Sequence, residues 1–228
     1  MSDAAHTTSM FKRSDLSRAK IQLLRNGHFA NAVVSRVDLD GESWTVKDFS
    51  SRPWYVRRLL APWLLGHELS ILRRLQGIDG VAQKAFRIDR DAIAVEFIDG
   101  SSLSRADKTL ISPAYLEALE ALLHRIHAAR VVHLDTRGTG NIMVREDGSP
   151  GLIDFQASLS TAWMPGWLRR ILEDVDMSGV LKKWRKYRPE AMGAEREAEL
   201  ERIDRLRKFW IFRGYFGLRK RRRRRRSS

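Results

Sequence analysis

The sequence predicts an α+β fold in two lobes, in which a small antiparallel sheet with one helix precedes a reduced helical half. Short β-prone runs separated by turn residues fill positions 21–98 and enclose one segment with helical periodicity. From residue 112 onward, apolar residues recur mainly at helical spacing. A cluster of polar residues between positions 133 and 155 falls where the two halves would meet.

The length of 228 residues suits one domain or two small lobes that share a cleft. Residues 1–14 are small and polar, and we expect them to form a flexible N-terminus. We expect the N-terminal lobe over residues 15–98 and the helical lobe, which contains the polar cluster, over residues 99–210. The remaining residues, 211–228, form a basic tail.

Five strands and one helix are expected in the first lobe. Three antiparallel strands lie between Ile21 and Phe49, since "DLDG" between "AVVSRV" and "WTVKDF" is a hairpin signal. Leu65, Leu69 and Leu72 then recur at helical spacing until "QGIDG" ends the helix. Two further strands follow in "AQKAFRID" and "AIAVEFI".

The second half begins with a helix. Ser112 is placed to cap it, Pro113 suits its first turn, and an apolar stripe runs from Leu119 to Ile126. A hairpin with the turn "EDGSP" follows, and its second strand ends at "LIDF". Beyond Ser160 the chain is expected to be helical, basic and rich in tryptophan.

Charge and cysteine content exclude several classes of protein. The net charge is +14, of which the run at residues 219–226 supplies eight positive charges, so +6 remains elsewhere and a polyanionic partner is expected. The absence of cysteine excludes disulfides, thiolate metal sites and cysteine nucleophiles. No signal-peptide core or apolar run of transmembrane length is present. We expect a cytoplasmic protein, either free or peripheral on the inner face of the membrane.

The polar cluster consists of two motifs. "VVHLDTRGTGNIMV" at residues 131–144 contains His-x-Asp and an Asn, and "GLIDFQAS" follows with an apolar-Asp-Phe sequence. With Lys47 in "WTVKDF" and Glu68 21 residues later, this order resembles the protein-kinase-like superfamily over residues 21–158. The resemblance is strongest to small atypical bacterial kinases of the RIO and lipopolysaccharide (Kdo) kinase types. It implies a two-lobed protein-kinase-like fold, with a catalytic loop in the second lobe.

The resemblance assigns nucleotide-binding roles in the first lobe. Lys47 would contact the α- and β-phosphates of ATP, and Glu68 would fix the position and charge of its ammonium group. Backbone groups near Glu96 and Ile98 would bind the edge of the adenine.

A glycine-rich loop would cover the phosphates in such a protein. In "RNGHFANAV" only Gly27 is kept of three glycines, Ala30 stands where the third is expected, and Phe29 matches the aromatic residue at the loop tip. Backbone N–H groups of this loop would contact the phosphates, but the segment is equally compatible with an ordinary turn.

The same resemblance implies the catalytic and metal-binding residues. Asp135 would orient the attacking hydroxyl and accept its proton, and Arg137 would steady the transferring phosphoryl group. Asn141 and Asp154 would bind magnesium, which prefers oxygen ligands of this kind. Taken singly, Asp135 and Asp154 are also compatible with strand ends and turn caps. We expect His133 and His127 to be structural.

Two features depart from the kinase pattern. Six residues separate Asp135 from Asn141, where five are usual, and the glycines of "RGTG" would absorb the extra residue in a bulged loop. Gln156 replaces the glycine of Asp-Phe-Gly, which favours a fixed loop over one that switches.

The resemblance implies an ATP- and magnesium-dependent phosphotransferase of serine/threonine-kinase-like type. Its acceptor would be a hydroxyl on a protein or on a lipopolysaccharide-type sugar. Two alternatives stay open: a catalytically inactive kinase-like scaffold that binds nucleotide, and a basic nucleic-acid-binding protein.

The C-terminal region combines Trp163, Trp167 and Trp184 with clustered arginine and lysine. Such a segment suits an anionic membrane surface, with indole rings at the interface and basic groups on phosphates. The same charges suit nucleic acid, and core tryptophans with a disordered tail are a third interpretation.

Overall fold

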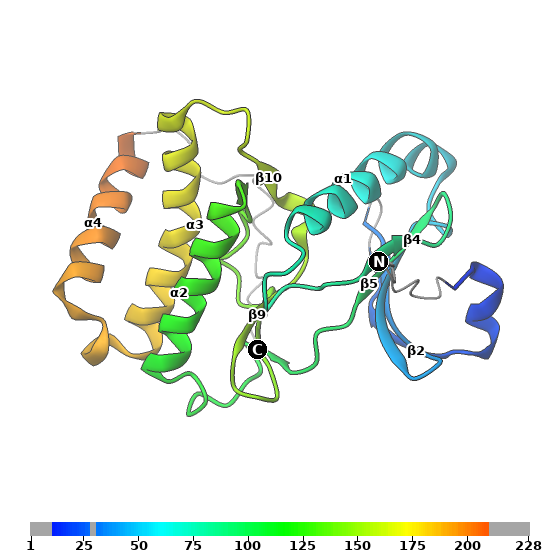
Figure 1. The fold of residues 1–228 in the computed structure, drawn as a ribbon, viewed down its shortest axis with the longest axis horizontal. Helices are drawn as coiled ribbons and strands as arrows, with labels where there is room; N and C mark the ends of the chain where they lie inside the picture. Colours follow the sequence, from blue (N-terminus) through cyan, green and yellow to red (C-terminus); the bar gives the residue numbers. More distant parts are fainter. Residues whose placement is uncertain (1–10, 28–30, 210–228) are drawn as a thin grey trace, which may run out of the picture.

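A five-stranded antiparallel sheet forms the N-terminal lobe of the computed structural model, which describes residues 11–27 and 31–209 (Figure 1). Its strand order is β1-β2-β3-β5-β4. The strands are β1 (Lys20–Arg25), β2 (Val33–Leu39), β3 (Glu42–Asp48), β4 (Ala85–Arg87) and β5 (Ala92–Glu96). Asp40 and Gly41 join β2 to β3 with φ of 51° and 82°, as a tight hairpin turn requires. The five predicted strands and the hairpin are confirmed.

One helix packs on this sheet. A π-helical turn (η2, Val56–Leu60) leads into α1 (Ala61–Arg74). The wide turn ends two residues before Pro62, which has no N–H to donate to a carbonyl in the preceding turn. The predicted apolar stripe of α1 is buried, and the carboxylate of Glu68 is buried with it.

The N-terminal segment departs from its prediction. Phe11 is buried and packs edge-on against Trp44 and Phe86, with ring centroids 5.9 and 5.1 Å away. A short 3-10 helix (η1, Arg13–Arg18) follows, and Arg13 Nη1 donates to Asp48 at 2.7 Å. Residues 11–14 are therefore part of the N-terminal lobe and not of a flexible lead-in. Residues 1–10 lie outside the described part of the chain.

Three helices and short strands form the second lobe. Helices α2, α3 and α4 pack in that order, and β8 and β9 form the predicted hairpin (Figure 1). The Oγ of Ser112 accepts a hydrogen bond from Tyr115 N at 3.1 Å, which confirms the predicted cap. The elements are β6 (Ser101–Ser102), α2 (Pro113–Ala128), β7 (Val131–Val132), β8 (Ile142–Val144), β9 (Pro150–Leu152), η3 (Phe155–Ala157), β10 (Leu159–Ser160), α3 (Gly166–Tyr187), η4 (Pro189–Ala191) and α4 (Gly193–Phe209).

One cluster of buried apolar residues extends through both lobes. Trp184 lies inside it, fully buried, with the guanidinium of Arg196 at 4.2 Å from its ring centre. It is therefore a core residue, as one of the three interpretations of the C-terminal region had it, because α3 turns it towards α2 and α4. Trp163 and Trp167 are exposed. Within residues 11–27 and 31–209, no helix is long and apolar enough to cross a membrane.

Candidate active site

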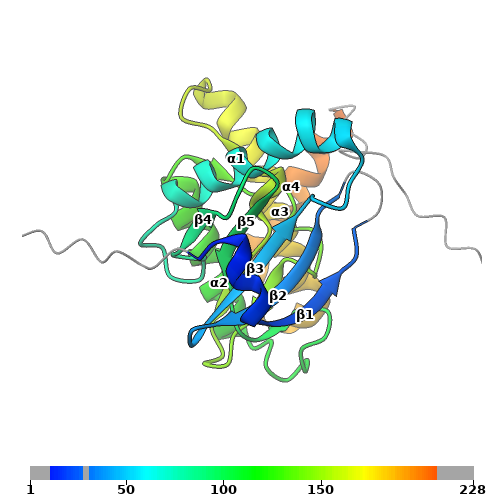
Figure 2. The ribbon, with the colours of Figure 1, turned by 90° about the vertical axis from the view of Figure 1, so that its right-hand side faces the viewer.

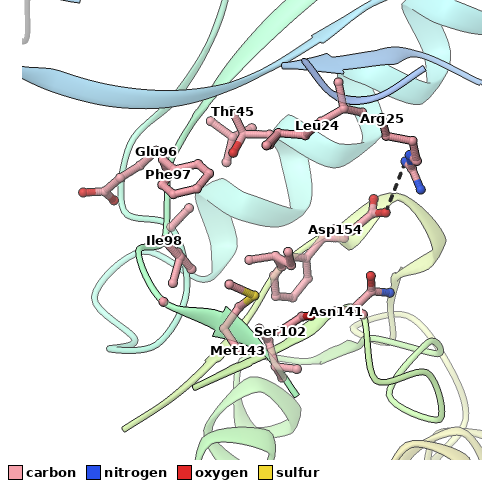
Figure 3. A pocket seen from close by; sticks show the side chains of 18 of the residues that line it. Leu24, Arg25, Thr45, Glu96, Phe97, Ile98, Ser102, Asn141, Met143 and Asp154 are labelled. Atoms are coloured by element: carbon pink, nitrogen blue, oxygen red, sulfur yellow. Dashed lines mark ion pairs between the residues drawn. The ribbon is translucent and has the colours of Figure 1, made fainter. Parts of the chain in front are cut away.

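A cavity of about 470 Å³ lies where the two lobes meet. Val34 and Val95 line it from the sheet, and Met143 and Leu152 line it from the second lobe. Polar side chains gather at the end where Asp154 and Asn141 lie, while Ile98 marks the other end (Figure 3). The cavity therefore offers an apolar slot that continues into a polar compartment, which suits a flat base joined to a charged group.

Lys47 connects three elements at the polar end of the cavity. It is buried on β3, and its Nζ lies 2.6 Å from Glu68 Oε1 on α1 and 2.7 Å from Asp154 Oδ1. Burial alone would lower the pKa of Lys47, but the two carboxylates outweigh it and hold the pKa above its ordinary value. The structure thus brings together Lys47 and Glu68, as the resemblance to kinases implied, and adds Asp154.

Asp154 sits in an unusual backbone conformation after β9. Its φ is 65° and its ψ is 71°, in the left-handed region that non-glycine residues rarely adopt. Such conformations persist where surrounding contacts over-determine them, and they cluster at functional sites. Burial acts to raise the pKa of Asp154, but Lys47 and, at 3.8 Å, Arg25 hold it below the ordinary value. Asp154 is therefore a carboxylate at neutral pH.

Asp135 and Asn141 face each other across the loop that follows β7. Asn141 Nδ2 donates to Asp135 Oδ2 at 2.6 Å, so the loop accommodates the extra residue between them. Desolvation raises the pKa of Asp135, and the negative charges of Asp154 and Asp176 act in the same direction. A carboxylate with a raised pKa is better suited to accept a proton than an ordinary aspartate.

The loop that carries Asp135 is held by Asp176, a residue that the sequence analysis missed. Asp176 is fully buried on α3, and its carboxylate accepts hydrogen bonds from His133 N at 2.5 Å and Leu134 N at 2.6 Å. Leu134 has a φ of 64°, so these bonds stabilise a strained backbone directly before Asp135. Helical spacing could have indicated the role, because Asp176 lies four residues from both Leu172 and Val180.

The two histidines are structural, as expected. His133 Nε2 lies 3.1 Å from the carbonyl of Ile153, and its ring packs on Phe155 with centroids 4.7 Å apart. His127 is buried, with Nε2 3.2 Å from Asp176. Both rings therefore support the loops that carry Asp135 and Asp154.

Arg137 does not line the cavity. It is exposed, and its carbonyl accepts a hydrogen bond from Lys183 Nζ at 2.7 Å. The structure therefore gives no support to a contact between Arg137 and a phosphate in the cavity.

The glycine-loop residues Phe29 and Ala30 lie outside the described residues. Gly27 is described, and a Cβ there would lie 2.2 Å from the carbonyl oxygen of Ala32. The close approach of the backbone within the turn therefore requires glycine at position 27, whether or not the loop contacts phosphate.

The segment expected to bind adenine, residues 96–98, lines the cavity. The side chain of Glu96 points away from the cavity (Figure 3), and its carboxylate accepts a hydrogen bond from Gln83 N at 2.6 Å. The backbone N–H of Ile98 donates to no described residue. Ile98 lines the apolar slot, and its N–H is not used by another described residue.

The oxygen atoms of Asp154 and Asn141 fit a magnesium ion by their chemistry. Among the described residues, no three histidine, aspartate or glutamate side chains gather as a complete metal cage. Magnesium commonly takes one or two protein oxygens and completes its coordination with phosphate and water. The site therefore suits magnesium that arrives with a nucleotide.

Two lobes around such a cavity, with this order of lysine and acidic residues, define the class of protein-kinase-like folds. A sequence model described as the RIO domain matches residues 43–196, and the chain belongs to this family of atypical kinase-like proteins. A solved structure with a similar fold is the Rio2 kinase-ADP/Mg²⁺-phosphoaspartate complex from Chaetomium thermophilum. It has 14% sequence identity and a TM-score of 0.55, and the match covers 86% of this chain and 74% of that one. No curated protein matches the chain.

Proposed function

We propose that the protein transfers the γ-phosphate of magnesium-bound ATP to a hydroxyl group on a protein or on a lipopolysaccharide-type sugar. The observation that carries the proposal is the contact of Lys47 with both Glu68 and Asp154 at the polar end of the cavity. This arrangement fixes a cation where the α- and β-phosphates would lie.

The described residues suit each part of the reaction. The adenine fits the slot between Val95 and Met143, with the N–H of Ile98 at its edge. Asn141 and Asp154 would hold magnesium, which when bound neutralises charge on the phosphates. Asp135 accepts the hydroxyl proton as the acceptor oxygen bonds to the γ-phosphorus and the bond from that phosphorus to the β-γ bridging oxygen breaks.

Purified protein with magnesium and γ-labelled ATP tests the proposal. Asp135→Asn should lower ATP turnover by about 10²- to 10⁴-fold, since it removes the proton acceptor. Glu146→Gln is the matched control, because Glu146 is an exposed carboxylate of the same lobe that lies in the turn between β8 and β9, whereas Asp135 is hydrogen-bonded to Asn141, which lines the cavity. Equal turnover in both variants and wild type would refute the assignment of Asp135.

The same assay separates the alternatives. A thermal shift with ADP and magnesium but no turnover would support the nucleotide-binding scaffold. An activity that needs residues 219–228 and ignores Asp135→Asn would support the nucleic-acid-binding protein. The solved Rio2 complex contains phosphoaspartate, so label retained on the chain should also be tested for hydroxylamine sensitivity, which distinguishes an acyl phosphate from a phosphoserine.

A further inference from the structure

Four tryptophan side chains of the described chain are exposed, in two short segments. Trp54 and Trp63 are 71% and 67% exposed and lie at the start of the helix that continues as α1. Trp163 and Trp167 are 77% and 60% exposed, where the chain enters α3. Tryptophan is highly buried on average, so exposed rings in clusters mark an interaction surface. We call residues 52–63 and 162–170 together the aromatic face.

The two segments of the aromatic face belong to different lobes but lie on the same side of the molecule. The starts of α1 and α3 are both on the upper side in Figure 1, with α1 above the sheet and α3 above the second lobe, and the perpendicular view of Figure 2 agrees. Helix α4 also ends there in both views. The described part of the chain therefore stops, at Phe209, on the side that carries the aromatic face.

The two segments of the aromatic face carry a positive charge. No acidic residue occurs in the segments 50–67 and 155–172, or after Asp204. Arg58 and Arg170 are exposed within the aromatic face and form no ion pair with a described residue. The sequence after α4 continues with "WIFRGYFGL" and then with eight consecutive basic residues. Aromatic and basic residues are thus combined in all three segments.

We infer that the aromatic face docks the protein on an anionic lipid bilayer. Indole rings favour the interface between headgroups and acyl chains, and arginines on the same surface bind lipid phosphates. Leu59 and Leu60 are exposed beside Trp63, and aliphatic side chains enter the acyl region but do not stack on nucleobases. The inference rests on this surface and not on the proposed phosphotransfer.

Vesicle co-sedimentation of the full chain tests the inference. The probes are vesicles of phosphatidylcholine alone and vesicles that also contain phosphatidylglycerol. The double variants Trp54→Ala/Trp63→Ala and Trp163→Ala/Trp167→Ala should each weaken partition into the anionic vesicles by about tenfold or more. Leu110→Ala is the control, because Leu110 is exposed and precedes α2. Helix α2 begins on the lower side of the molecule in Figure 1, opposite the side that carries the aromatic face.

The possible outcomes decide the inference. Binding to anionic vesicles that falls in both double variants, and is kept by Leu110→Ala and by Asp135→Asn, would support it whatever the enzymatic activity. No binding to anionic vesicles would overturn it, and so would equal binding by wild type and both double variants. Tryptophan-dependent binding of single-stranded RNA without vesicle binding would overturn it in favour of nucleic acid.

Discussion

Asp176 gives the sharpest test of how the loop that carries Asp135 is held. Its carboxylate accepts hydrogen bonds from the backbone N–H groups of His133 and Leu134. In Asp176→Ala both N–H groups lose their acceptor, and each unsatisfied buried donor costs about 1–3 kcal/mol. The expected loss in the free energy of unfolding is therefore about 2–6 kcal/mol. Asp176→Asn keeps one acceptor oxygen, so about 1–3 kcal/mol is expected.

The same variants should reduce catalysis through the position of Asp135. Leu134 needs its left-handed backbone to present Asp135, and the bonds to Asp176 stabilise that conformation. A displacement of about 1 Å at a reacting group can lower the rate by about 10²-fold. We therefore expect Asp176→Asn to lower kcat by about 10²-fold, while the affinity for ATP, whose phosphates we assign to Lys47 on β3, changes less.

Urea denaturation and steady-state kinetics measure the two effects. Asp174→Asn is the matched control on the same helix, since Asp174 pairs at the surface with Arg202 and should change stability by about 0–1 kcal/mol. An Asp176→Asn protein with wild-type stability would refute the calculation. An Asp176→Asn protein that is destabilised but keeps the wild-type kcat would refute the proposal that Asp176 positions Asp135.

Three further predictions concern the charges around the cavity. Lys47→Met and Asp154→Ala should each abolish the rise in melting temperature that ADP with magnesium gives the wild type. Asn141→Ala should move the acidic limb of the kcat–pH profile to higher pH, because its amide hydrogen bond acts to lower the pKa of Asp135. Burial, with Lys186 and Arg137 adding, lowers the pKa of Lys183 from 10.5 to about 8. The unfolded chain therefore binds more protons between these values, so stability should rise from pH 8 to 10.5 in wild type and less in Lys183→Met.

The N-terminal lobe was predictable from the sequence because its signals are local. Turn residues separate its strands, and the leucines of α1 recur at helical spacing. The position of Phe11 was not predictable, since its burial depends on Trp44 and Phe86, which are distant in the sequence. A polar segment with one aromatic residue has no periodicity from which such a contact could be inferred.

The candidate site likewise contains residues that could be predicted from the sequence and residues that could not. Lys47, Glu68 and Asp154 were identified because each lies in a short motif that resembles one of the protein-kinase-like superfamily. Arg137 was not placed correctly relative to the cavity, because the direction of a side chain in an irregular loop depends on contacts such as that of Lys183 with its carbonyl. Asp176 escaped notice because it acts on backbone groups of another segment, and no motif records that contact.

The backbone of this segment explains why Gln156 can stand where kinases usually have a glycine. The left-handed conformation belongs to Asp154, whereas Gln156 lies in the 3-10 helix η3, which any residue with ordinary φ can occupy. Directly after η3, the carbonyl of Ser158 lies 2.7 Å from His67 Nε2 on α1. Helix α1 is thus attached both to this segment and, through Glu68, to Lys47. A glycine at position 156 would let the backbone flip and would weaken the attachment of α1 to this segment. Gln156 and the two contacts of α1 therefore favour the same arrangement, in which Lys47 contacts both Glu68 and Asp154.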